Sequence, residues 1–148
     1  MGVYTRFKRE AGGFRKLVEL LESSPAVRRK KMIEVGMAED AEYTRQALAF
    51  MLNFEDILGL PDMELAEVIA HAPSPRTIAF AIRPLPEDIH RKFIRNSKPT
   101  VGAELRDLVT MEVALRDVGA AQLKLIEIAR ALERKGRVSV KKIPLSLT

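Results

Sequence analysis

Apolar side chains recur along most of this chain at the spacing of an amphipathic helix. Phe14, Leu17, Val18 and Leu21 occupy positions i, i+3, i+4 and i+7, which places them on one face of a helix. The longest such repeat comes near the end of the chain and consists of Val118, Ala121, Leu125, Ile128, Ala129 and Leu132. The pattern predicts an all-α fold whose last helix covers residues 118–135 and stops at Gly136.

Prolines and short polar residues mark where the successive helices begin. A serine, aspartate or asparagine side chain can cap a first turn, and proline fits the first helical position because no N–H is needed there. The start signals are, in order, Ser24-Pro25, Asp62, Pro75, Pro86 and Pro99. Between the first two, a helix over residues 39–54 keeps its aromatic residues on one face. Short helices of this kind suit antiparallel stacking into a superhelix, and the pattern itself leaves the hand open.

Three segments fall outside the helical pattern. Residues 1–12 lack periodicity and end next to two glycines, so we expect a flexible leader. Residues 137–143 alternate between apolar and polar positions, and we expect a short strand there that pairs with residues 113–115. This would add a tiny β-ribbon to an otherwise helical chain, followed by a tail over residues 143–148.

Composition narrows the class of protein. A chain of 148 residues, 47% of them hydrophobic, can bury a core of its own. It has no cysteine, which excludes disulfides and thiolate sites, and no apolar run long enough for a signal peptide or a membrane span. The sequence therefore predicts a soluble chain. The net charge of +5 is unevenly placed, with eight acids and one base over residues 39–67 but six bases and one acid over residues 130–142.

The residues do not form a pattern typical of catalysis or metal binding. His71 and His90 lie on separate predicted helices, without the i, i+4 partner of a helical zinc site. No serine lies in a G-x-S-x-G turn, and no glycine-rich phosphate loop occurs. Adjacent carboxylates such as Glu87 and Asp88 fall at helix starts, where they offset the helix dipole. We expect no enzyme activity, no metal and no cofactor.

The charges of residues 83–109 favour binding to another macromolecule. Two predicted helices here leave Arg91, Lys92 and Arg95 opposite one apolar stripe, and Glu104 and Asp107 opposite the other. A protein partner fits such a mixed surface. Nucleic acid is an alternative, because the sequence pI is about 9.7 and basic clusters also occur over residues 28–31 and 134–142. Against it, the phenylalanines fall mainly at predicted core positions and leave no stacking platform.

Several segments, in this order, resemble the C-terminal half of the FliG family, the flagellar motor switch proteins. They are MLNFEDI at residues 51–57, LAEVI at 65–69, KFIRN at 92–96 and AAQLKLIEIARALERKG at 120–136. The resemblance covers most of the chain. It implies an armadillo-like right-handed superhelix of short helices, with an armadillo-like unit over residues 13–58 that ends in the MLNF linker, and a FliG C-terminal-like helical domain over residues 59–142.

The same resemblance implies a rotor or switch component that is cytoplasmic, at the inner face of the cell membrane in the flagellar basal body. Its partners would be proteins: the cytoplasmic loop of the stator, other switch-complex subunits, and stacked copies of itself. A diverged adaptor or scaffold without torque function is an alternative. Membrane contact would be indirect, and no small-molecule substrate is implied.

By position, the family's basic residue at the corner matches Arg83, and the first acid of its charged helix matches Asp107. Three further positions where the family has charges hold Thr100, Leu108 and Ala114 in this sequence. We expect the partner-binding surface to consist of Arg83, Lys98, Glu104, Arg106, Asp107 and Arg116. We expect Met51, Leu52 and Phe54 to form a hinge or a stacking surface.

Overall fold

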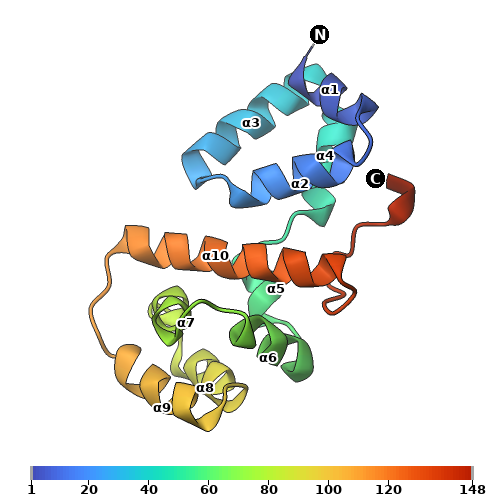
Figure 1. Cartoon of the computed structure of the whole chain (residues 1–148). Coiled ribbons are helices and arrows are strands. Elements are labelled where there is room, and N and C mark those ends of the chain that lie inside the picture. The colour runs from blue at the N-terminus through green and yellow to red at the C-terminus, as the bar shows by residue number, and fades with distance from the viewer. Residues whose placement is uncertain (1, 148) are drawn as a thin grey trace. The chain divides into compact units, whose positions relative to one another are not determined.

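The structure, a computed structural model, describes residues 2–147, and within that range it contains helices and no strand (Figure 1). The predicted all-α fold class is therefore confirmed, while the hand of the superhelix stays a prediction. The elements are α1 (Val3–Arg9), α2 (Gly13–Ser23), α3 (Ala26–Glu39), α4 (Ala41–Phe50), α5 (Phe54–Leu58), α6 (Asp62–Ala70), α7 (Pro75–Ile82), α8 (Glu87–Arg95), α9 (Pro99–Leu108), α10 (Leu115–Arg134) and the 3₁₀ helix η1 (Leu145–Leu147).

The chain divides into two compact units. Unit 1 contains residues 2–52 and 141–147, with α1 to α4 and η1, and unit 2 contains residues 53–140, with α5 to α10. The sequence-based division placed the boundary after residue 58 and assigned the last residues to a separate tail. The C-terminal segment belongs instead to unit 1, because Ile143 is buried in the core of that unit.

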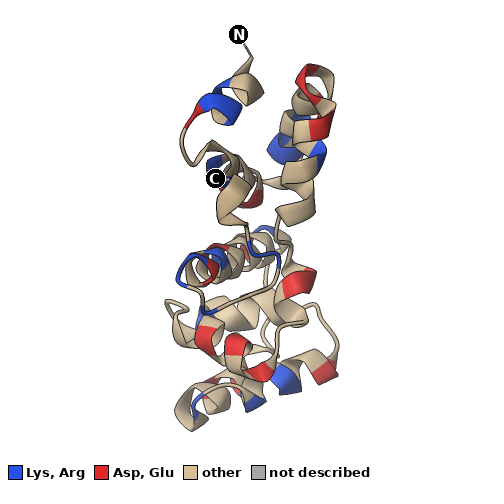
Figure 2. Ribbon diagram, turned by 90° about the vertical axis from the view of Figure 1, so that its right-hand side faces the viewer, with Lys and Arg blue, Asp and Glu red and all other residues tan. Residues whose placement is uncertain are grey.

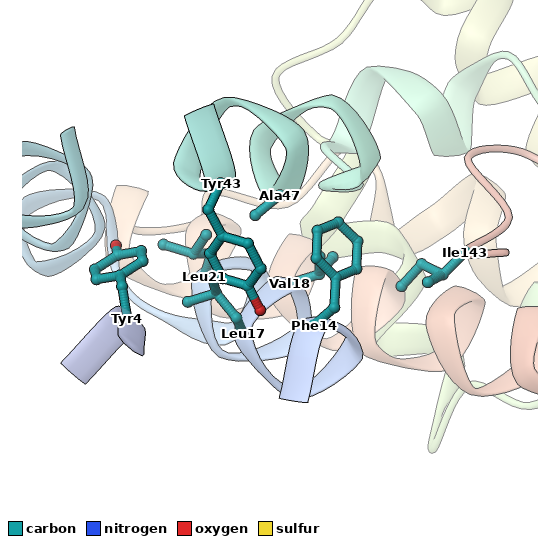
Figure 3. Packing of buried hydrophobic residues seen from close by; sticks show 8 residues of the cluster. All are labelled: Tyr4, Phe14, Leu17, Val18, Leu21, Tyr43, Ala47 and Ile143. Atoms are coloured by element: carbon teal, nitrogen blue, oxygen red, sulfur yellow. The ribbon is translucent and has the colours of Figure 1, made fainter. Parts of the chain in front are cut away.

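The core of unit 1 forms where α2 and α4 pack on each other. Its buried cluster consists of Tyr4, Phe14, Leu17, Val18, Leu21, Tyr43, Ala47 and Ile143 (Figure 3). Phe14 meets the ring of Tyr43 edge to face, with 5.7 Å between centroids. The i, i+3, i+4, i+7 stripe of α2 is thus buried as the sequence predicted. Burial of such large side chains contributes about 1.5–3 kcal/mol each.

Residues 3–9 correct the expectation of an unstructured leader, because they form α1. Tyr4 is buried, and its hydroxyl donates a hydrogen bond to the Met32 carbonyl at 2.5 Å. The Thr5 N–H donates to the Glu39 carboxylate at 2.7 Å, which satisfies an amide in the first turn of α1. The helix is too short to show a repeat in the sequence. Its contacts with α3 are made to residues about thirty positions away.

In unit 2, α10 lies along one side and packs against α5, α6 and α7, with α8 and α9 on the far side of those helices (Figure 1). Leu125, Ala129 and Leu132 are buried, as the predicted 3.6-residue repeat requires. After Lys135, Gly136 adopts a left-handed conformation with φ of 76°, and the Arg137 N–H donates to the Leu132 carbonyl at 2.9 Å. This confirms Gly136 as the helix stop.

The predicted helix over residues 39–54 is confirmed up to Phe50 and wrong at its C-terminal end. It is broken between Phe50 and Phe54, and the second piece is α5. Asn53 causes the restart: its side chain accepts the Asp56 N–H at 3.0 Å, and the Asp56 carboxylate accepts the Asn53 N–H at 2.9 Å. This reciprocal capping box begins a new helix, which the apolar spacing alone did not indicate.

The expected β-ribbon is also wrong, since the described residues contain no strand. In the segment expected to pair, the Ser139 N–H donates to the Glu64 carboxylate of α6 at 3.0 Å, where a strand would have used a main-chain carbonyl. Val138 is buried. The alternation therefore reflects the buried side chains of Val138 and Ile143 in an irregular segment, and not a sheet.

Candidate functional site

The α9 surface, defined as Lys98, Glu104, Arg106 and Asp107, is the exposed charged face of α9. Pro99 starts the helix, and burial of Gly102 and Leu105 orients it, so that all four charged residues are exposed. Gly102 faces Ile94 of α8, and a Cβ there would meet that side chain at 3.4 Å. No ion pair within residues 2–147 involves these four residues, so their charges are available to a partner.

Arg83 lies beside the C-terminal end of α9 and not on it. Its Nε donates to the Met111 carbonyl at 2.7 Å, which joins the end of α7 to the connection between α9 and α10. Gln122 of α10 donates to the Ala81 carbonyl at 2.9 Å, in the same region. Arg83 is half-buried, and part of its hydrogen-bonding capacity serves the fold.

The other candidates spread along this side of unit 2. Asp107 is in the last turn of α9, four residues before Met111, whereas Lys98 is the N-cap at the opposite end. Nine residues of helix separate the two by about 13 Å. Arg116 is exposed in the first turn of α10. The structure therefore brings Arg83 and Asp107 to the same end of α9, and leaves Lys98 at the other.

The basic residues of α8 are largely engaged within unit 2. Arg91 pairs with Glu87 at 3.5 Å and Arg95 with Asp62 at 3.4 Å. Lys92, expected to face water, is half-buried and donates to the carbonyls of Leu58 and Leu60 at 2.6 and 3.1 Å. Charged residues of both signs are interspersed over the unit (Figure 2). A continuous basic track for phosphates is absent from the described part of α8 and α9, which disfavours the nucleic-acid alternative.

The residues expected to form a hinge or stacking surface lie at the boundary between the units. Met51 and Leu52 belong to unit 1, and Phe54 begins α5 in unit 2. Leu52 is only 1% exposed, so it cannot contribute to an exposed stacking surface. Its N–H donates to the buried Glu22 carboxylate at 2.7 Å. The Met51 carbonyl accepts from Lys141 at 3.0 Å.

Sequence reasoning missed Glu22 and Lys141. Glu22 falls four residues after Val18, inside the apolar stripe of α2, and a carboxylate in such a stripe indicates a buried hydrogen bond. The position of Glu22 could therefore have been recognised from the sequence. Nothing in the sequence around Lys141 indicates its hydrogen bond, because its partner Met51 lies ninety residues away.

The described residues hold no group of three or more histidine, aspartate or glutamate side chains placed to bind a metal ion. His71 and His90 each contact a main-chain carbonyl, of Glu67 at 2.8 Å and Ile82 at 2.6 Å. In the same part of the chain no helix is long and apolar enough to cross a membrane.

These features define a class of protein: a helical module whose accessible chemistry is a set of unpaired surface charges. Comparison with known families makes the class specific. Residues 37–140 match the model of the FliG C-terminal domain, and the chain belongs to that family.

Curated relatives agree. The chain is 28% identical over 141 residues to the flagellar motor switch protein FliG of Thermotoga maritima, and that match covers 94% of this chain and 42% of the relative. It is 25% identical to FliG of Helicobacter pylori, over 89% of this chain and 39% of the relative. The chain thus spans about two fifths of the length of these relatives.

Solved structures show the same fold. The crystal structure of FliG residues 86–343 from H. pylori matches with a TM-score of 0.64 and 24% identity, over 92% of this chain and 65% of that one. Full-length FliG from Aquifex aeolicus matches with a TM-score of 0.54 and 22% identity, over 89% of this chain and 41% of that one.

Proposed function

We propose that this chain acts as a component of the flagellar rotor, in the motor switch, and binds protein partners through the α9 surface together with Arg83 and Arg116. The observation that carries the proposal is the family match over residues 37–140, which includes all of these residues. The exposure of the α9 surface and of Arg116 supports it. Charges without partners inside the chain can pair across an interface at little cost to the fold.

The proposed partners are the cytoplasmic loop of the stator and the other subunits of the switch. Such partners place the chain in the cytoplasm, at the inner face of the cell membrane. Because the α9 surface carries both signs, it fits a partner surface that also carries both signs in a complementary order. Interactions of this kind contribute orientation and association rate more than affinity, and salt weakens them.

A binding experiment with charge reversals tests the proposal. Purified stator loop and switch subunits from the same organism serve as probes against the full chain and its variants Lys98→Glu and Asp107→Lys. We expect about tenfold weaker binding of at least one probe at low salt, and a smaller difference at high salt. Arg83 is less suitable, because its reversal also breaks the hydrogen bond to Met111.

Lys135→Glu is the matched control. It changes the net charge as Lys98→Glu does, and Lys135 is exposed at the opposite end of α10 from Arg116. Helical content and thermal midpoint should be unchanged in all three variants. If the α9 variants bind every probe as the control does, the α9 surface is not the binding site.

Two positions on α9 favour an adaptor without torque function as the second candidate. Thr100 is exposed and uncharged, and Leu108 is half-buried where the resemblance leads us to expect an acid. The α9 surface therefore has fewer charges than a torque-generating surface would be expected to carry. A complementation experiment separates the two candidates: the gene for the chain is expressed in a strain that lacks it, and swimming speed is measured. The double variant Thr100→Arg, Leu108→Asp should swim faster than the unmodified chain only if torque depends on charges at these two positions.

A further inference from the structure

Unit 1 contains a hollow that the proposed function does not use. It has a volume of about 500 Å³ and lies among α1, α2 and α3. Its lining is almost entirely apolar and consists of Val3, Tyr4, Phe7, Leu17, Pro25, Val27, Met32 and Val35, together with the side chains of Arg28 and Lys31. Tyr4 and Leu17 also belong to the core cluster of Figure 3, so the inner wall of the hollow is the outer side of that core.

α3 has apolar residues beside the core cluster and also beside the hollow. Ile33 packs against the core cluster, and Gly36 is buried beneath the ring of Tyr4. Val27 and Val35 are on another face, eight residues apart, and remain 86% and 48% exposed. Solvent-facing valines on the wall of an apolar hollow are typical of a surface that binds a partner.

The charges at the hollow are of one sign. Arg28 and Lys31 are exposed, and neither forms an ion pair within residues 2–147. Unit 1 has twelve lysine and arginine residues against seven acids, whereas unit 2 has thirteen of each. The entire net charge of +5 therefore lies on unit 1, where it attracts acidic partners.

We propose that this hollow binds an acidic amphipathic helix of a partner protein. The apolar side chains of that helix would fill the hollow, and its carboxylates would pair with Arg28 and Lys31. The volume of about 500 Å³ lies within the range of concave, mostly apolar binding pockets. Apart from Arg28 and Lys31 the lining has no polar group that could hydrogen-bond to nucleic-acid bases, and a concave surface cannot be filled by a flat bilayer. A second copy of unit 1 would bring another basic surface and be repelled.

Peptide binding to the full chain tests this proposal. The probe is a fluorescein-labelled amphipathic helix of about 18 residues with Leu and Phe on one face and Glu on the other; a second peptide has the same apolar residues and Lys in place of Glu. Fluorescence anisotropy should show binding of the acidic peptide, weakened by salt, and little binding of the basic one. Equal binding of both peptides would overturn the proposal.

Variants locate the site. The double variant Arg28→Glu, Lys31→Glu should weaken acidic-peptide binding by about tenfold or more, and Val35→Asp should remove it by placing a charge in the apolar wall. Lys30→Glu is the matched control, since Lys30 is exposed in the same basic run but does not line the hollow. Circular dichroism checks that all variants stay folded.

Two further outcomes would refute the proposal: no effect of the double variant, or sedimentation that shows copies of the chain associating through Val35. The result is independent of the proposed function. Asp107→Lys, which tests the α9 surface, should leave acidic-peptide binding unchanged, so failure of either proposal can be recognised separately.

Discussion

The carboxylate of Glu22 accepts the main-chain N–H of Leu52 at 2.7 Å, across thirty residues of sequence. Glu22 is 3% exposed and Leu52 is 1% exposed, so both groups are removed from water. The neighbouring Met51 carbonyl accepts from Lys141. Two charged side chains of unit 1 thus fix the end of that unit, one residue before Asn53 begins the capping box of α5.

Replacement of Glu22 should loosen this end of unit 1. Glu22→Ala leaves the buried Leu52 N–H without an acceptor, at a cost of about 1–3 kcal/mol, and we expect much faster hydrogen exchange of that amide. Glu22→Gln keeps an acceptor oxygen and should have a smaller effect. Lys16→Ala is the control on the same helix, because Lys16 is exposed and its ion pair with Glu10 lies at the surface. Unchanged protection of the Leu52 amide in Glu22→Ala would contradict this role.

Removing one residue of the buried pair Arg130–Glu133 in α10 should lower the free energy of unfolding more than replacing both residues with apolar ones. Its N to O distance is 2.6 Å, and the two side chains are 2% and 1% exposed. Removing one partner from a buried pair costs about 3–5 kcal/mol, whereas apolar replacement of both is often neutral. We expect Arg130→Met and Glu133→Leu each to lower the free energy of unfolding more than the double variant does.

The exposed pair Lys124–Glu127 provides the comparison for that experiment. It has the same i, i+3 spacing on the same helix, with a distance of 3.5 Å. Its removal should change the free energy of unfolding by less than about 1 kcal/mol. Urea titration of both sets measures the difference. A double variant of Arg130 and Glu133 less stable than both single variants would show that further contacts of the two side chains dominate.

Gly36→Ala should destabilise unit 1 although it improves helix propensity. A Cβ at Gly36 would overlap the ring of Tyr4 and approach the Thr44 hydroxyl to 2.6 Å. Overpacking costs about 1–3 kcal/mol, against a gain of about 1 kcal/mol from alanine in a helix. Gly119→Ala in α10 is the control, since nothing lies within 4 Å of its Cβ, and it should stabilise the chain. Denaturant midpoints of the two variants should move in opposite directions.

The carboxylate of Asp40 should contribute to acid stability. The Tyr43 N–H at the start of α4, and then Lys8 at 3.2 Å, hold the pKa of Asp40 below its ordinary value of 3.8. A lowered pKa means that the fold favours the charged form. The stabilisation is present above the unfolded pKa and is lost as the pH falls through the folded pKa.

Carboxyl titration by NMR checks this. In Lys8→Met the pKa of Asp40 should rise but stay below 3.8, because the Tyr43 N–H still donates. A pKa of Asp40 at or above 3.8 in the unmodified chain would refute the assignment.

The sequence by itself determined most of the helices and their buried faces, but not α1 or the start of α5. Phe14, Leu17 and Leu21 are buried where their spacing placed them, and Pro75, Pro99 and Gly136 mark helix ends as their backbone preferences require. These features follow from interactions within a few residues, so the local pattern contains them. The exposed charges of α9 were predictable for the same reason, because an amphipathic helix leaves its polar residues outside.

Only the tertiary structure decided which charged side chains form hydrogen bonds within the fold, and where the first and last segments of the chain pack. Lys92 and Arg83 looked like free surface charges, yet each bonds a main-chain carbonyl 28 residues or more away. α1 and Ile143 enter the core of unit 1 from opposite ends of the chain. The physical reason is that the local sequence around a side chain does not show which distant carbonyl will accept its hydrogen bond, or which gap in a core it will fill. Long-range contacts select those partners after the helices have packed.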